Sequence, residues 1–197
     1  MLTTTTNMRR ALCARCLALV LLMPALSGGS YLGYLQTSGN FHSIVAGEAY
    51  RSGQLTYDEF VHYIGQYNIK SILNLRGTNK GSDWYEDELA AIRRMHVKLI
   101  DYGISANKDV PDVDIKTLMR IVSDAPKPIL IHCKGGADRS GLIAALYLYS
   151  LGRPADESSR QLSVAYGHIS FWNTTQAMDR TFWRYVGAHA PDRLAFR

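Results

Sequence analysis

The sequence lacks the features that define several classes of protein. Only three of its 197 residues are cysteine, no segment repeats, and no stretch has the polar, low-complexity composition of a disordered tail. An excess of one charge is also missing, because 19 basic side chains stand against 17 acidic ones once residues 1–30 are set aside. A balance so near neutral argues against a nucleic-acid-binding surface. The length suits one compact domain with a short appendage.

Cysteine is scarce outside the N-terminus. Cys13 and Cys16 form a C-x-x-C pattern within an apolar segment, with no second pair nearby, so we expect neither a redox pair nor a metal site there. Cys133 is the one cysteine in the rest of the chain. Without a partner for a disulfide, it is either a buried inert thiol or a reactive one, and its sequence neighbours decide between the two.

Residues 1–35 have the pattern of a targeting segment. Arg9 and Arg10 precede an apolar run, residues 16–26, which small residues follow. This order is typical of a secretory signal peptide, whereas a run extended to the end of the segment reaches the length of a membrane anchor. In either case the arginines remain in the cytoplasm. We therefore expect the domain, residues 36–197, to be exported across the inner membrane, either free in the periplasm or tethered there by the segment from Arg9 onward.

Short apolar runs alternate with amphipathic segments in the remaining chain. The runs predict strands at 48–54, 71–75, 97–102 and 128–132. Helical spacing predicts helices at 56–67 and 83–95, one opened by Pro111, and others at 140–151, 155–166 and 174–186. Residues 36–47 are expected to be irregular. The alternation predicts an α/β fold, a single domain with a central, mostly parallel sheet flanked by helices.

The segment between the last predicted strand and its apolar helix reads His-Cys-Lys-Gly-Gly-Ala-Asp-Arg-Ser-Gly (residues 132–141, the cysteine loop). Its glycines let the backbone curl so that successive N–H groups face one point and form an anion-binding nest. The helix dipole adds to the same point, and the planar guanidinium of Arg139 matches two phosphate oxygens. The same field stabilises a nucleophilic thiolate at Cys133. The Ser140 hydroxyl is placed to hydrogen-bond the sulfur and ease its departure from a phosphocysteine.

This segment resembles the H-C-x5-R-[ST]-G signature of protein tyrosine phosphatases, and the single short domain resembles their dual-specificity branch. The matching residues are His132, Cys133, Arg139, Ser140 and Gly141. Residues 50–54 and 72–76 are similar to segments of compact bacterial and atypical dual-specificity phosphatases. The resemblance implies hydrolysis of a phosphate monoester through phosphocysteine, with no metal or other cofactor. The substrate is either a phosphorylated protein or a small phosphate ester.

The general acid has two candidates. In the family, this aspartate lies on a loop after the strand predicted at 97–102, and Asp109 is our candidate there. Asp112 is interpreted as a charge at a helix N-terminus, and Asp101 as a strand end. Asp138 is the alternative, because some bacterial phosphatases with an Asp-Arg pair in the cysteine loop use that aspartate as the acid. Otherwise Asp138 orients the neighbouring arginine or a backbone N–H.

The residues expected to bind substrate form the loop itself: Lys134, Gly135, Gly136, Ala137, Asp138 and Arg139. Lys134 resembles the lysine of phosphoinositide-type loops. However, Ala137 replaces the second lysine of those loops, so Lys134 is equally interpretable as a solvated charge at the rim.

Several residues outside the signature have structural interpretations. His132 is predicted to be buried and to hydrogen-bond the loop backbone. His168 and Trp172 could line the pocket, but we predict that they are packing residues. Arg51 and Arg76 either support the loop or are plain surface charges.

Two other functions use a comparable loop. A phosphate- or phosphopeptide-binding module would keep the cradle without turnover. A rhodanese-like sulfurtransferase also carries a cysteine loop, although such loops are usually shorter and lack the signature above.

Overall fold

The computed structural model describes residues 28–31, 33–35, 37–171 and 176–194. The chain divides into two units, residues 1–37 and 38–197. The described part of the first unit is helical. Most of the predicted targeting segment lies outside the described residues, and within them no helix is long and apolar enough to cross a membrane.

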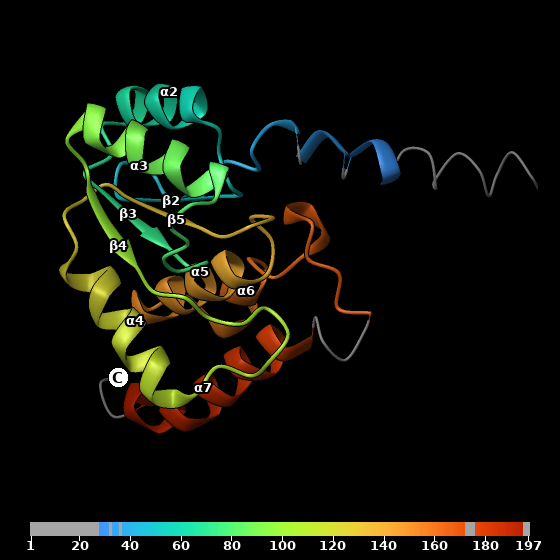
Figure 1. Cartoon of the computed structure of the whole chain (residues 1–197). Helices are drawn as coiled ribbons and strands as arrows, with labels where there is room; N and C mark the ends of the chain where they lie inside the picture. Colours follow the sequence, from blue (N-terminus) through green and yellow to red (C-terminus); the bar gives the residue numbers. More distant parts are fainter. Residues whose placement is uncertain (1–27, 32, 36, 172–175, 195–197) are drawn as a thin grey trace, which may run out of the picture. The chain divides into compact units, whose positions relative to one another are not determined.

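Five strands form one mixed sheet in the second unit, in the order β1-β2-β5-β3-β4 (Figure 1). They are β1 (His42–Val45), β2 (Ala49–Ser52), β3 (Ser71–Asn74), β4 (Lys98–Asp101) and β5 (Ile129–His132). β1 runs antiparallel to β2, and the other three pairs are parallel. The predicted α/β fold with a mostly parallel sheet is confirmed. β5 is the central strand. The cysteine loop follows the carboxyl end of β5, and open α/β sheets bind ligands at this edge.

The strand β1 corrects the prediction that residues 36–47 are irregular. None of its four residues is buried, and its register with β2 breaks between Ser43 and Val45. A four-residue edge strand with an irregular register carries little hydrophobic alternation, so the sequence pattern did not predict it.

The helices up to residue 150 follow the predicted pattern closely, whereas the last two predicted helices differ. The observed helices are α2 (Tyr57–Tyr67), α3 (Asp83–Met95), α4 (Asp112–Asp124), α5 (Arg139–Ser150), α6 (Ala155–Ser159) and α7 (Gln176–Leu194), with a 3₁₀ turn, η1, at Val164–Tyr166. α2 begins where expected because Thr56 and Glu59 form a reciprocal capping box, each side chain bonding the other's backbone N–H.

The predicted helix at 155–166 is wrong in its middle, between α6 and η1. There Gln161 turns its backbone and side-chain oxygens toward the buried guanidinium of Arg51, at 2.7 and 2.8 Å. The backbone N–H groups of residues 160–162 bond the carbonyls three residues earlier, so the α-helical pattern has ended before Gln161 reaches Arg51. α7 continues past its predicted end at residue 186, and the first two residues predicted for it lie outside the described residues.

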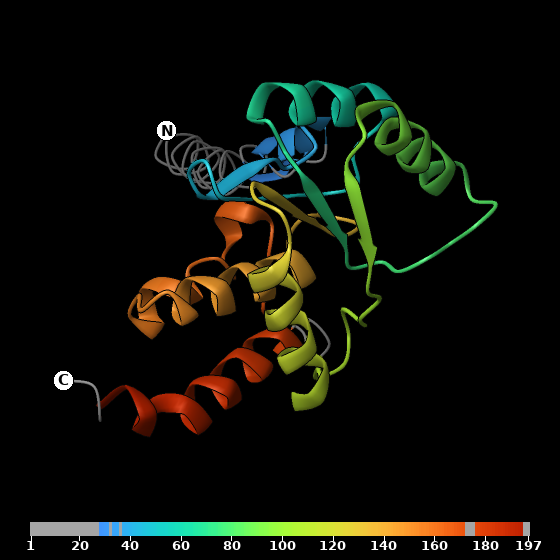
Figure 2. The same cartoon turned by 90° about the vertical axis from the view of Figure 1, so that its left-hand side faces the viewer.

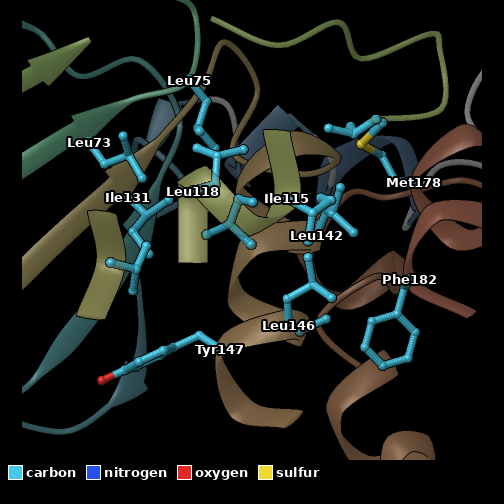
Figure 3. Packing of buried hydrophobic residues seen from close by; sticks show 14 of the residues in the cluster. Leu73, Leu75, Ile115, Leu118, Ile131, Leu142, Leu146, Tyr147, Met178 and Phe182 are labelled. Atoms are coloured by element: carbon cyan, nitrogen blue, oxygen red, sulfur yellow. The ribbon is translucent and has the colours of Figure 1, made fainter. Parts of the chain in front are cut away.

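Helices cover both faces of the sheet. α2 and α3 pack on one face, and α4, α5 and α7 lie beyond the other (Figures 1 and 2). The larger core joins Leu73 and Ile131 of the sheet to Leu142 and Leu146 of α5 and Phe182 of α7 (Figure 3). α5 is buried along most of its length. This packing fixes the helix N-terminus, where the cysteine loop ends.

Candidate active site

A buried arginine supports the cysteine loop from beneath. Arg51, at the end region of β2, is 0% exposed, and its Nη2 donates to the carbonyl oxygens of Gly136 and Ala137 at 2.7 and 2.9 Å. Its other terminal nitrogen, Nη1, donates to the backbone and side-chain oxygens of Gln161. The guanidinium lies 4.3 Å from the ring centroid of Tyr166. Burial lowers the pKa of Arg51 to about 10, against the opposing charge of Cys133, so the group stays cationic at neutral pH. Arg51 is therefore a support of the loop.

Two further donors hold the preceding carbonyls of the loop. The backbone N–H of Gln54 donates to Lys134 O at 3.0 Å, and Asn40 Nδ2 donates to Gly135 O at 2.9 Å. With Arg51, these donors turn the carbonyls of residues 134–137 outward. Because C=O and N–H point in opposite directions across a trans peptide, the amides of residues 135–138 face the other way. A loop held in this way has the backbone arrangement that the predicted anion-binding nest requires.

Cys133 is buried directly before these amides in the loop. It is 2% exposed, and its Sγ lies 3.4 Å from Ser140 Oγ, in the first turn of α5. The backbone N–H of Cys133 donates to Ser52 O at 3.4 Å, which ties the start of the loop to β2. The structure thus places the Ser140 hydroxyl beside the sulfur, and its role in releasing the sulfur stays a prediction.

Arg139 leaves one edge of its guanidinium unpaired. Its Nη1 donates to Leu75 O and Ile104 O, at 3.1 and 3.3 Å, which fixes the group against the ends of two strands. Its Nε is buried and has no hydrogen-bond partner among the described residues. An unpaired donor of this kind costs free energy, and an anionic oxygen at the loop would satisfy it.

His132 departs from its predicted role. It is buried as expected, but its Nε2 lies 3.0 Å from Glu88 Oε1 on α3 and does not bond the loop backbone. Glu88, also 0% exposed, accepts from Gln54 Nε2 at 3.2 Å, and Arg76 Nη1 donates to Gln54 Oε1 at 2.8 Å. The Arg76 guanidinium stacks 3.3 Å from the ring centroid of Trp84. Arg76 is therefore the outer end of a side-chain network that reaches the residue before the nucleophile.

Sequence reasoning missed Glu88. The available signal was an acidic residue within the apolar stripe of the helix predicted at 83–95. A buried carboxylate requires a partner, and the histidine of the signature is a suitable one.

His168 is buried, as the packing prediction expects, but it also makes polar contacts with the cysteine loop. Its buried imidazole lies between two carboxylates, with Nδ1 2.6 Å from Asp138 Oδ1 and Nε2 2.9 Å from Asp179 Oδ2. Burial alone lowers the pKa of His168, but the two carboxylates outweigh it and raise this pKa to about 9. Trp172, the other residue of that prediction, lies outside the described residues.

Asp109 is not in contact with the cysteine loop. Its half-exposed carboxylate binds Arg180 of α7, with Nη2 and Oδ1 2.6 Å apart, and lies 3.8 Å from Arg184. Ile104, earlier in the same segment, does reach the site, through the carbonyl that Arg139 contacts. Asp112 starts α4 as expected.

Asp101 and Lys134 occupy the positions of their structural interpretations, the end of a strand and the rim of the loop. Asp101 ends β4 and accepts a hydrogen bond from Asn74. The Lys134 side chain is exposed at the rim of the loop, whereas Ala137 is buried.

Comparison with known proteins identifies the family. Residues 38–181 match the family model described as "DSP-PTPase phosphatase fused to NAD+ Kinase". The chain belongs to the dual-specificity phosphatase family. Inositol diphosphatase DSP5 of Arabidopsis thaliana is 32% identical over 106 residues, which cover 51% of this chain and 50% of that protein. Inositol diphosphatase SIW14 of Saccharomyces cerevisiae is 33% identical over 110 residues, covering 53% and 37%. The chain thus spans about half or less of the length of these relatives.

Solved structures share the fold of this phosphatase domain. TpbA of P. aeruginosa superposes with a TM-score of 0.59 at 19% identity, covering 73% of this chain and 85% of that one. The core catalytic domain of the PP-IP phosphatase SIW14 from S. cerevisiae gives a TM-score of 0.57 at 22% identity, covering 77% and 93%. At these identities the likeness establishes the architecture.

Proposed function

We propose that the protein hydrolyses phosphate monoesters through a phosphocysteine on Cys133. The observation that carries this proposal is the buried Nε–H of Arg139, which has no partner among the described residues and belongs to a loop whose carbonyls are held on its outer side and whose cysteine sulfur lies beside a serine hydroxyl. Sγ attacks phosphorus, the ester P–O bond breaks, and the leaving oxygen takes a proton from an acid. Water then attacks the phosphocysteine and gives a proton to the carboxylate that the first step left. The P–S bond breaks, inorganic phosphate is released, and Ser140 donates a hydrogen bond to the departing thiolate.

We propose Asp109 as the acid because its present contacts with Arg180 and Arg184 are exposed and easily exchanged. The Asp109 and Arg180 side chains are 40% and 48% exposed, and exposed pairs contribute only about 0–1 kcal/mol. Asp138 is instead held by a buried histidine. Contacts of a catalytic acid often form only when substrate binds, so the separation of Asp109 from the loop does not conflict with this role.

The acid is tested by comparing leaving groups. We expect Asp109→Asn to lower kcat by roughly 10²–10⁴-fold for phenyl phosphate, and much less for p-nitrophenyl phosphate, whose leaving group needs little protonation. Asp138→Asn is the matched comparison. If Asp138→Asn shows the leaving-group dependence and Asp109→Asn does not, the assignment is reversed.

The substrate proposal draws on the relatives. Curated relatives are named inositol diphosphatases, and a TpbA variant has been crystallised with pTyr. We propose a phosphate monoester or, by the same attack at the P–O bond of a phosphoanhydride, an inositol diphosphate. Exposed Lys134 and partly exposed Arg76 are available to further anionic groups. Phosphate release from a phosphotyrosine peptide, a phosphoserine peptide and an inositol diphosphate, compared at equal enzyme concentration, ranks these classes.

The first experiment is metal-free hydrolysis of p-nitrophenyl phosphate by the full chain. Cys133→Ser should abolish turnover, whereas Cys16→Ser, a cysteine outside the described residues, should retain it. A wild-type protein that binds phosphate without hydrolysing any ester would be a phosphate-binding module. Turnover of thiosulfate instead would indicate a sulfurtransferase.

We also propose that residues 1–35 direct export. The arginines before the apolar run support this, and the family match begins only at residue 38. Protease added to intact spheroplasts should degrade the domain, and carbonate extraction then separates a tethered form from a released one. Protection of the domain by the inner membrane would refute export.

A further inference from the structure

A carboxylate lies within the proposed phosphate cradle. Asp138 is the N-cap residue of α5, directly before the phosphate-binding Arg139, and its side chain is 31% exposed. Its charge has the same sign as that of a bound phosphate dianion. An ionised Asp138 without a partner would therefore oppose anion binding at the point where the helix dipole and the amides favour it.

The partner of Asp138 is His168, which must be protonated to donate to both Asp138 and Asp179. His168 is 1% exposed, and each of its ring nitrogens is within hydrogen-bond distance of a carboxylate oxygen. Ionised carboxylates only accept hydrogen bonds, so both nitrogens must carry hydrogen for both contacts to form. Ser170 Oγ completes the arrangement by donating to Asp179 Oδ2 at 2.7 Å.

The contacts come from three parts of the chain. Asp138 belongs to the cysteine loop, His168 follows η1, and Asp179 lies in the first turn of α7. Arg51 of β2 binds the two carbonyls before Asp138 and interacts with the Asp138 charge. Asp138 and Asp179 are the carboxylates that contact His168 within the described residues.

We propose that His168 is a positioning residue that neutralises Asp138 and holds it in place, so that the cradle binds a phosphate dianion well only while His168 is protonated. This inference rests on the proposed function, because it assumes that the cradle holds phosphate. Burial opposes the charged imidazole, but the two carboxylates outweigh burial and raise the pKa of His168 to about 9. The imidazolium therefore persists at neutral pH and is lost in alkaline solution.

The test is binding of inorganic phosphate, which needs no turnover. Calorimetry is performed on the full chain carrying Cys133→Ser, so that ionisation of the thiol does not contribute. At pH 7.5 we expect His168→Gln to weaken phosphate binding roughly 10–100-fold, as for the loss of one close countercharge. The same substitution at His62, an exposed histidine of α2, serves as the control and should change the affinity less than twofold.

The second carboxylate variant separates charge from structure. In an Asp138→Asn background there is no charge to neutralise, so His168→Gln should weaken phosphate binding by less than about threefold. The parent Cys133→Ser protein should lose affinity between pH 8 and 10, and Asp138→Asn should remove that loss. If His168→Gln fails to fold, Asp179→Asn replaces it and should move the alkaline loss of affinity to lower pH.

Each outcome decides a separate claim. If His168→Gln weakens binding equally with Asp138 intact and in the Asp138→Asn background, or weakens it in neither, the neutralising role is overturned and the phosphate cradle still stands. Absence of phosphate binding by the Cys133→Ser parent refutes the proposed function as well.

Discussion

Replacing Gly136 by alanine should disable the cradle, and Gly47 provides a control of the same backbone conformation. The two glycines have φ of +71° and +74°. An alanine at either position therefore adopts the left-handed region, which costs about 1–2 kcal/mol. The surroundings differ. A Cβ at Gly136 would lie 2.5 Å from Gly53 N and 2.8 Å from Ser52 C, whereas a Cβ at Gly47 meets nothing within 4 Å.

The additional cost at Gly136 comes from backbone that has little room to move. Ser52 belongs to β2, which pairs with β5, and Gly53 N donates to Gly39 O at 2.8 Å. Overpacking of this kind adds about 1–3 kcal/mol. We therefore expect Gly136→Ala to lower the free energy of unfolding by about 2–5 kcal/mol and Gly47→Ala by about 1–2 kcal/mol.

Urea unfolding measures both losses, and competition by phosphate against p-nitrophenyl phosphate measures the cradle. Gly136→Ala should also weaken phosphate binding by at least tenfold, because the amides of residues 135–138 move with it. Gly47→Ala should leave phosphate binding unchanged. Equal losses of stability and unchanged phosphate binding in both variants would refute the close approach of the loop to β2.

Three further changes test other supports. Arg51→Lys keeps the charge but cannot bind both Gln161 and the loop carbonyls. It should lower the free energy of unfolding in urea by about 2–4 kcal/mol. The control Arg153→Lys, at an exposed residue, should lower it by less than about 0.5 kcal/mol. His168 has a folded pKa of about 9, above its usual 6.5. Its stabilisation is therefore complete below pH 6.5 and is lost as pH rises through 9, a fall of about 3 kcal/mol in urea-measured stability that His168→Gln should abolish. Thr56→Ala removes the α2 cap and should cost about 1 kcal/mol by thermal unfolding, and an unchanged midpoint would contradict the capping box.

The features that sequence predicted best are those with local causes. The apolar run before His132 fixes the central strand, and the capping pattern at Thr56 fixes the start of α2. The glycines and the helix N-terminus of the signature are also local, so the loop was predicted as an anion nest without its distant supports. These predictions needed no knowledge of which segments meet in space.

The partners of the loop could not be predicted because each contact spans a long stretch of chain. Arg51 meets residues 85 and 86 positions away, His132 meets a glutamate 44 positions away, and Asp138 meets a histidine 30 positions away. The spacing of apolar residues predicts which face of a helix or strand packs in the core. It does not predict which polar side chain of that element meets a polar group from a distant segment. Arg51 therefore had two open interpretations, and His168 was assigned to packing.

The supports of the cradle link its stability to its charge. Converging amides repel one another, so their carbonyls need strong donors on the outer side, and a cation is a stronger donor than a neutral group. Arg51 satisfies two of these carbonyls from a site that water does not reach, and its pKa of about 10 keeps it charged near neutrality. The same charge lies close enough to Cys133 and Asp138 to interact with both. A neutral hydrogen-bond donor in place of Arg51 would hold the two carbonyls without adding positive electrostatic potential at the loop. We therefore expect a variant with such a donor to fold normally but to bind phosphate weakly.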